Sequence, residues 1–211
     1  KDAVLIGHSM GGIISRLLVS DADLVKPAVA LLNNSRANKY KNDPLFKSRL
    51  QMNHVPNFSR AIFLASPHRG TEFADRWFTL AARKIIKLPG AFLGALADTV
   101  QDGNLKNFGK EVGNGLIQNG PSDLSNNSKF TEITKNVMPY KGFKYHSIIG
   151  NNTLSDDLNI ISDDIVPYSS AHLDGAISEK IIKGGHSIQE TPEAVLELRR
   201  VLKLHLMDLG L

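Results

Sequence analysis

The chain has 211 residues, of which 42% are hydrophobic and 22% are charged, and its formal net charge is +4. This size and composition are enough for one domain with a sizeable core. The basic residues are scattered without a run of five, which argues against nucleic acid as a partner. No stretch approaches the roughly 18 apolar residues of a membrane-spanning helix. The absence of cysteine excludes disulfides, thiol catalysis and cysteine zinc sites, and is compatible with both the cytoplasm and the cell envelope.

The apolar pattern predicts a parallel sheet covered by helices. Short apolar strands are expected over residues 3–6, 61–65, 145–149 and 180–182. One helix is expected over about residues 10–19, and another begins after Thr191, the predicted cap. The expected apolar face of this last helix consists of Val195, Leu198, Val201, Leu202 and Leu206. Because long crossovers separate the strands, the predicted class is α/β with a mostly parallel sheet flanked by helices.

Two long segments interrupt this scaffold. Residues 21–58 are rich in Asn, Lys and Arg, and predict an extended crossover or part of a cap. Residues 71–140 form the larger insertion, where a helical lid or cap over an active site is expected. Within it, residues 73–88 combine Trp77 and Phe78 with four basic side chains, a pattern typical of a basic amphipathic helix. We expect Trp77 and Phe78 to contact substrate and this helix to contact a membrane surface, with simple packing on the core as the alternative.

The segment Gly-His-Ser-Met-Gly at residues 7–11 lies between the first predicted strand and the first predicted helix. In this context a G-x-S-x-G motif indicates a nucleophile elbow with Ser9 at its tip. The glycines two residues before and after Ser9 are expected because so tight a turn leaves little room for side chains. The turn would direct the N–H of Met10 at a developing oxyanion. His8 is expected to help pack the turn, and contact of its side chain with the substrate is also expected.

A serine nucleophile needs a general base, which in turn needs an orienting carboxylate. Among the seven histidines, His186 follows the last predicted strand in a Gly-Gly-His-Ser segment and precedes the last helix. From such a loop its imidazole can reach over the sheet edge to Ser9. His146 lies within a predicted strand and His205 on the last helix, so both are expected to be structural. Two aspartate pairs follow the strand at residues 145–149 and compete for the role of the acid: Asp156 with Asp157, and Asp163 with Asp164.

Four motifs, in the same order along the chain, resemble the lipase and esterase branch of the α/β-hydrolases, including bacterial triacylglycerol-lipase-like proteins. They are Gly-His-Ser-Met-Gly-Gly at residues 7–12, Ser-Pro-His-Arg-Gly at 66–70, Ser-Asp-Asp-Ile-Val-Pro at 162–167 and Gly-His at 185–186. The resemblance implies that residues 1–211 are a partial α/β-hydrolase domain. Because four strands normally precede the elbow in this fold, the chain resembles its C-terminal part without the N-terminal strands. This expectation leaves open whether a signal peptide or membrane anchor precedes Lys1.

The resemblance also assigns individual residues. The acid segment of the family usually reads Asp-Gly-x-Val, which places the acid at Asp163 and leaves Asp164 in the usual glycine position as the alternative. The Pro-His-Arg-Gly segment shapes the floor of the site in the family, so His68 is expected to support the site or to contact substrate. Some secreted lipases bind calcium through an aspartate just after the catalytic histidine. Ser187 and Ile188 stand there in this chain, and no metal is expected.

These observations together predict a serine carboxylester hydrolase of the lipase or esterase type, acting on an acyl ester that is lipid-like. The expected catalytic residues are Ser9 as nucleophile, His186 as base and Asp163 as orienting acid. No cofactor is expected, because water completes the reaction. Two alternatives stay open: an acyltransferase that uses the same triad, and a non-catalytic binding module of the same fold. Product analysis with an added acceptor would distinguish the first, and the presence of all three residues in order argues against the second.

Overall fold

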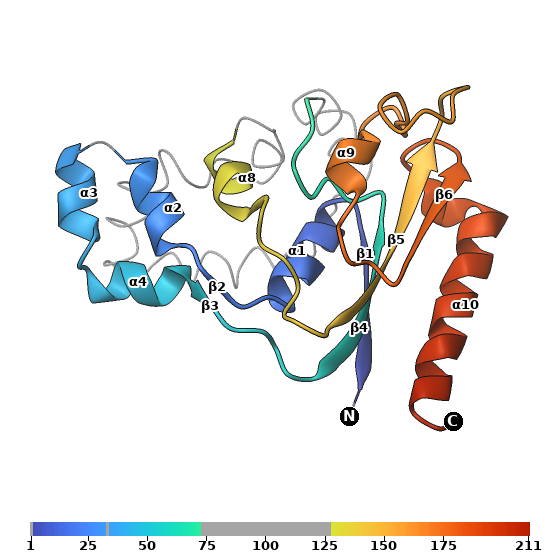
Figure 1. The fold of residues 1–211 in the computed structure, drawn as a ribbon, viewed down its shortest axis with the longest axis horizontal. Helices are drawn as coiled ribbons and strands as arrows, with labels where there is room; N and C mark the ends of the chain where they lie inside the picture. Colours follow the sequence, from blue (N-terminus) through green and yellow to red (C-terminus); the bar gives the residue numbers. More distant parts are fainter. Residues whose placement is uncertain (1, 33, 73–127) are drawn as a thin grey trace, which may run out of the picture.

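A computed structural model describes residues 2–32, 34–72 and 128–211 of the chain. Its main sheet has four strands in the order β1-β4-β5-β6, and all three neighbouring pairs are parallel (Figure 1). Their bounds are Ala3–His8 for β1, Phe58–Leu64 for β4, Lys144–Asn151 for β5 and Ser178–Lys183 for β6. The four predicted strands and the parallel sheet are therefore confirmed, with ends that differ by up to three residues. The carboxyl ends of these strands lie together along one edge of the sheet.

Helices cover both faces of this sheet, because alternate strand residues point to opposite sides. On one face, Ile62 and Leu64 of β4 and Ile148 of β5 pack with the final helix α10, Pro192–Asp208. On the other face, Ala61 and Phe63 pack with Val19, which follows helix α1, Met10–Leu18. Strand β4 is buried on both faces, and this explains the near-continuous apolar run from which the strand was predicted.

Helix α10 has the predicted cap but a different buried face. The Thr191 side chain accepts a hydrogen bond from Ala194 N–H, at 3.3 Å, and Pro192 occupies the first turn. The buried side chains are Ala194, Glu197, Val201 and His205. Two residues of the predicted apolar face meet the core: Val201 is buried, and Leu198 packs against it. The other three, Val195, Leu202 and Leu206, are exposed by a third or more, and for these the prediction was wrong. A small residue and two polar ones share the stripe that meets the sheet, and Arg200 neutralises the buried Glu197 carboxylate.

Residues 21–58 fold into a helical excursion with a small core of its own. Strands β2, Ala22–Asp23, and β3, Gln51–Met52, pair antiparallel at its base. Helices α2, Val25–Ala30, α3, Asn34–Tyr40, and α4, Pro44–Leu50, lie between them, at the left of Figure 1. Val25, Ala28, Tyr40 and Phe46 form the core, and Ile133 of helix α8, Lys129–Thr134, packs against it. The segment thus folds into a small helical unit within the domain. The sequence had predicted an extended crossover or part of a cap.

Two short elements complete the edge where the strands end. Helix α9, Tyr168–Ala171, follows the loop after β5, and the 3-10 helix η2, Ile188–Glu190, follows the loop after β6 (Figure 1).

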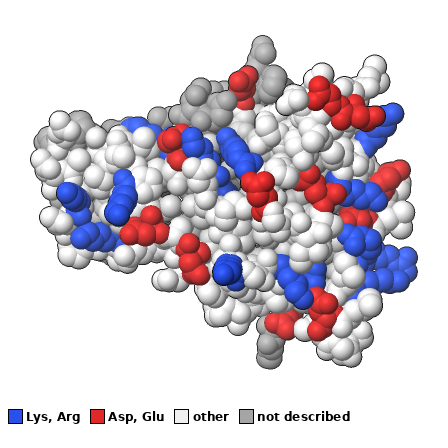
Figure 2. Space-filling model, viewed as in Figure 1, with Lys and Arg blue, Asp and Glu red and all other residues white. Residues whose placement is uncertain are grey.

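The predicted amphipathic helix at residues 73–88 lies outside the described residues, as does most of the predicted insertion. Among the helices that are described, none combines the length and the apolar character needed to cross a membrane. Acidic and basic side chains alternate over the face shown in Figure 2, without a continuous patch of either sign.

A buried cation joins three segments beneath the nucleophile helix. Arg16 of α1 is fully buried, and its guanidinium donates hydrogen bonds to the backbone oxygens of Val137 and His68. Burial, followed by the neighbouring Arg69 cation, lowers the pKa of Arg16 to about 10. The group therefore stays charged at neutral pH. The contacts tie α1 to the loop after β4 and to the segment before β5.

Candidate active site

Ser9 lies at a sharp turn between β1 and α1. It is the N-cap residue of α1, with φ 54° and ψ −126°, a region that side-chain-bearing residues rarely adopt. Its N–H donates to the backbone oxygen of Leu64, at 2.9 Å, which fixes the turn to the end of the neighbouring strand β4. Such backbone strain is typical of functional sites, where the surrounding structure enforces it. The strained strand-to-helix turn matches the geometry expected of a nucleophile elbow.

Close packing around the turn explains the need for glycine at two positions. A Cβ atom on Gly7 would lie 2.5 Å from the backbone oxygen of Gly11, and one on Gly12 would lie 1.8 Å from Ser66 Oγ. A Cβ on Gly11 would meet no atom within 4 Å. The expectation that Gly11 is required for lack of space is therefore wrong. Gly11 contributes its backbone to the contact with Gly7, and the second sterically required glycine is Gly12.

His186 joins Ser9 to a carboxylate. Its Nε2 lies 2.9 Å from Ser9 Oγ, and its Nδ1 lies 2.8 Å from Asp163 Oδ2. All three side chains are buried, with exposed fractions of 6% for Ser9, 7% for His186 and 1% for Asp163. A carboxylate only accepts hydrogen bonds, so Nδ1 of the imidazole carries the hydrogen in this contact, and in the corresponding tautomer Nε2 accepts from the serine hydroxyl. Three residues separated by up to 177 positions along the chain thus form one chain of hydrogen bonds.

The two aspartates at residues 163 and 164 have different surroundings. Asp163 uses its second oxygen, Oδ1, to accept from the N–H groups of Ile165 and Val166, at 2.9 and 2.6 Å. Asp164 is exposed, has φ 75° and accepts from the side chain of Asn152. The positive φ explains why a glycine is usual at this position, and aspartate is among the few other residues that tolerate it. Of this pair, Asp163 is the one in contact with His186.

Gly150 of β5 is a residue that the sequence reasoning missed. A Cβ atom at this position would lie 2.7 Å from Asp163 Cβ and 2.8 Å from Ile188 Cγ2. The bare backbone therefore makes room for the acid and for the residue that follows the histidine loop. A glycine near the end of a predicted strand is a signal of such a close approach. Only the position of Asp163 in space, however, shows which side chain needs the room.

His8 and His68 occupy different surroundings. His8 is half-buried, and its Nε2 donates to the backbone oxygen of His186, at 2.8 Å. His68 is 2% exposed and lies edge-on to Phe63, with a centroid distance of 4.9 Å. Burial, followed by the cations of Arg16 and Arg69, holds the pKa of His68 well below its usual value, so the ring is neutral. This burial favours the structural alternative for His68 over contact with a substrate.

Met10, the predicted oxyanion donor, is the first residue of α1 and follows Ser9 directly. The first N–H groups of an α-helix have no partner one full turn back, and the N–H of Gly12 donates to the backbone oxygen of Ser9, at 3.0 Å. The role of the Met10 N–H stays a prediction. Trp77 and Phe78, the other predicted contacts, lie outside the described residues.

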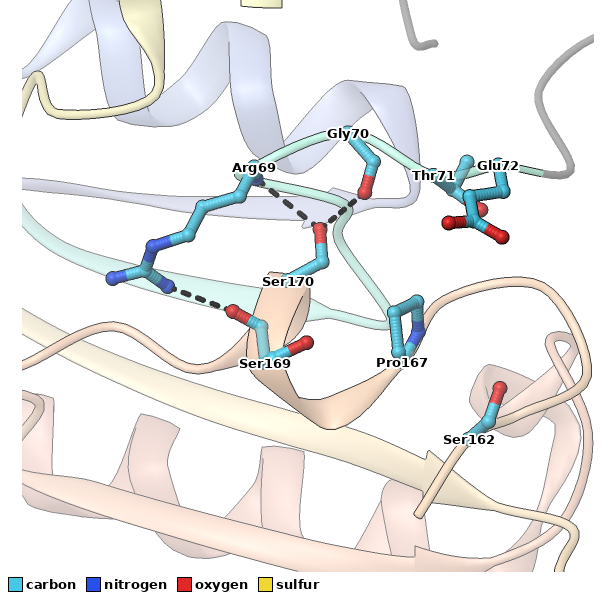
Figure 3. Close-up of a pocket in the computed structure, with 8 residues that line it drawn as sticks. All are labelled: Arg69, Gly70, Thr71, Glu72, Ser162, Pro167, Ser169 and Ser170. Carbon is cyan, nitrogen blue, oxygen red and sulfur yellow. Dashed lines mark hydrogen bonds between the residues drawn. The ribbon is translucent and has the colours of Figure 1, made fainter. Parts of the chain in front are cut away.

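A cavity of about 480 Å³ lies between the loop after β4 and helix α9 (Figure 3). Ser170 Oγ donates to the backbone oxygen of Gly70 and accepts from Arg69 N–H, which joins the two walls. The lining includes the Glu72 carboxylate and Ser162, the residue before Asp163. Neither Ser9 nor His186 lines this cavity, so it borders the acid segment and is separate from the serine. Within the described part of the chain, no three potential metal ligands cluster together.

No protein-family model matches the chain, and a comparison with curated protein sequences gives no match either. Among solved structures, the chain is similar to the mature lipase BlEst2 of Bacillus licheniformis, with a TM-score of 0.40 and 19% identity over 88% of this chain and 59% of the lipase. It is also similar to Staphylococcus hyicus lipase, with a TM-score of 0.42 and 17% identity over 88% of this chain and 62% of the lipase. For the Vlm2 thioesterase domain the values are 0.30 and 16%, over 96% of this chain and 65% of that domain.

The chain thus spans about three fifths of the length of these two lipases. At such TM-scores the likeness carries no argument about activity. The function has to come from the geometry of the site itself.

Proposed function

We propose that this chain carries the active site of a serine carboxylester hydrolase of the α/β-hydrolase class. The observation that carries the proposal is the hydrogen-bonded series from Ser9 Oγ through both nitrogens of His186 to Asp163 Oδ2, with distances of 2.9 and 2.8 Å. A buried serine held to a neutral imidazole, which is itself held to a carboxylate, is the arrangement that makes a hydroxyl nucleophilic at neutral pH.

The reaction would proceed in two half-reactions, acylation of Ser9 and hydrolysis of the acyl-serine. Ser9 Oγ forms a bond to the acyl carbon while its proton passes to Nε2 of His186, and the Asp163 carboxylate stabilises the resulting imidazolium. The tetrahedral intermediate collapses, the bond to the alkoxy oxygen breaks, and His186 returns the proton to the leaving alcohol. Water then attacks the acyl-serine by the same route and releases the acid. The N–H of Met10 would donate to the oxyanion in both halves.

The acyl group is proposed to be lipid-like. This finer assignment rests on the resemblance of the four sequence motifs to lipases and on the apolar residues predicted in the insertion. A comparison of acetate with long-chain esters tests it, because each methylene bound in an apolar site contributes about 0.8 kcal/mol. A preference for long chains would support the assignment, and equal rates on both would contradict it. Contact of the insertion with a membrane surface is part of the same proposal.

The test of the reaction is substitution of the nucleophile. Ser9→Ala should lower hydrolysis of an activated ester by roughly 10⁶ and abolish labelling by a fluorophosphonate. Ser48→Ala is the matched control, because the Ser48 hydroxyl is exposed on α4 and donates to the backbone oxygen of Leu45 in its own helix. Labelling that persists in Ser9→Ala would refute the assignment. Transfer of the acyl group to an added alcohol in preference to water would identify an acyltransferase.

A further inference from the structure

The backbone of His186 is held by a residue next to the nucleophile. His186 follows Gly184 and Gly185, and Gly184 has φ 151°, a backbone conformation that favours glycine. A loop with two glycines has little preference of its own for one position of the imidazole. His8 Nε2, however, lies 2.8 Å from the backbone oxygen of His186 and donates to it. His8 is the last residue of β1, so the strand that delivers Ser9 also holds the loop that delivers His186.

The carbonyl acceptor determines the hydrogen on His8. A carbonyl oxygen only accepts, so Nε2 of His8 carries a hydrogen in every protonation state that keeps this contact. The neutral ring is then the Nε2–H tautomer, with Nδ1 unprotonated. Desolvation lowers the pKa of His8, and the nearby His186 ring also lowers it, against the raising effects of the hydrogen bond to His186 O and of Asp163 and Glu190. His8 is therefore uncharged at neutral pH.

The charge of His8 matters because the two imidazoles are close. Their ring centroids are 5.0 Å apart. In the proposed reaction His186 becomes an imidazolium, and a second cation at this distance would oppose that step by about tenfold or more in rate. Protonation of His8 would keep the hydrogen bond to His186 O and add only the charge. The contact and the charge of His8 thus have separable effects.

We propose that His8 is a positioning residue for His186: it holds the histidine loop through its Nε2–H and permits formation of the imidazolium by staying neutral. This inference rests on the proposed function and goes beyond it. It replaces the expectation of direct substrate contact by His8 with action through the base. Among the described residues, the titratable groups that face His8 are His186, Asp163 and Glu190.

Two substitutions separate the contact from the charge. In His8→Gln the side-chain amide can donate from about the position of Nε2 and cannot become charged. We expect kcat near pH 8 to stay within about tenfold, and the acid limb of the profile of log kcat/KM to be shallower than in wild type, because one of two protonations is removed. In His8→Leu the donor is lost, and kcat should fall by about 10²-fold with little change in KM. His54→Gln is the control, because His54 pairs with Asp21 at the opposite end of the sheet and should leave the profile unchanged.

The outcomes distinguish this inference from the proposed function. A folded His8→Leu with wild-type kcat and wild-type acid limb would overturn the inference, as would a His8→Gln profile as steep as that of wild type. Nitrogen-15 NMR of the histidine rings supplies a readout that does not need turnover: wild-type His8 should show the Nε2–H tautomer, and the Nδ1–H tautomer would overturn the contact. A wild-type protein without turnover that keeps the Nε2–H tautomer would refute the proposed function and leave the contact standing.

Discussion

The two turns that present the candidate site are held in place by different means. The turn at Ser9 is held by close packing and by the neighbouring strand: Gly7 and Gly12 allow the backbone of Gly11 and the side chain of Ser66 to approach to distances that no Cβ permits, and Ser9 N–H donates to the backbone oxygen of Leu64. The turn at Asp163 is held from within, because the Asp163 side chain itself accepts from the N–H groups of Ile165 and Val166. Both turns contain a residue at positive φ, Ser9 in the first and Asp164 in the second.

As a consequence, the catalytic group at the Ser9 turn does not stabilise the turn, whereas the catalytic group at the Asp163 turn also does. At the Ser9 turn the hydroxyl has no part in holding the backbone, so the hydroxyl can be removed without disturbing the fold. At the Asp163 turn one carboxylate oxygen maintains the turn while the other meets His186. A substitution there affects both functions unless it preserves the first oxygen.

Among the substitutions that test this comparison of the two turns, the largest effect is expected at Asp163. Asp163→Asn can keep an oxygen toward Ile165 and Val166 while its amide group faces His186, which favours the wrong imidazole tautomer and should lower kcat by roughly 10⁴. Asp163→Ala should lose similar activity and in addition about 1–3 kcal/mol of unfolding free energy, because two N–H groups lose their acceptor. Ester kinetics and urea denaturation measure the two effects. Equal loss of stability in both variants would show that the side chain does not hold the turn.

The next effect is steric and belongs to the Ser9 turn. Gly7→Ala places a Cβ against backbone atoms and should cost about 3 kcal/mol or more, which is at the upper end for overpacking. Gly11→Ala has open space and a helical position, so its unfolding free energy should stay unchanged or rise by up to about 1 kcal/mol. Thermal unfolding of the pair gives the comparison. A Gly11→Ala variant as unstable as Gly7→Ala would mean that the turn is tighter on its helical side than described.

The smallest effect is expected at Asp164. Asp164→Asn keeps a residue that tolerates positive φ and should change activity by less than about tenfold and stability by less than about 0.5 kcal/mol. Asp164→Val should cost about 1–2 kcal/mol, because a β-branched side chain is strained in the left-handed region. If Asp164→Asn abolished turnover while Asp163→Asn did not, the roles of the two neighbours would be exchanged.

Chain order and strand ends predicted that Ser9 and His186 lie close together, and the two side chains are 2.9 Å apart. Ser9 and His186 both follow parallel strands, and the carboxyl ends of parallel strands lie at one edge, so a local pattern predicts a shared location. The contact between His186 and Asp163, with Asp164 turned away, depends on the backbone angle of Asp164, which the sequence of the pair does not reveal. The same limit applies to Gly12, because its neighbour Ser66 lies on a different strand loop.

Side-chain size misled the prediction of the α10 face. The sequence pattern gave weight to large aliphatic residues such as Val195 and Leu206, which are exposed. The stripe that meets the sheet contains Ala194 and the charged Glu197, which pairs with Arg200 on the next turn of the helix and lies 3.9 Å from Lys180 of β6. Periodicity therefore predicted that this segment is a helix and did not predict its orientation.

The contacts of the buried Arg16 do not depend on which side chains its partner residues carry. Its guanidinium binds the backbone oxygens of Val137 and His68, and every amino acid supplies a backbone oxygen. The side chains of Val137 and His68 therefore take no part in the tie beneath the nucleophile helix. The tie depends on the identity of Arg16, whose planar fork reaches both acceptors at once in a way that the point charge of lysine does not reproduce.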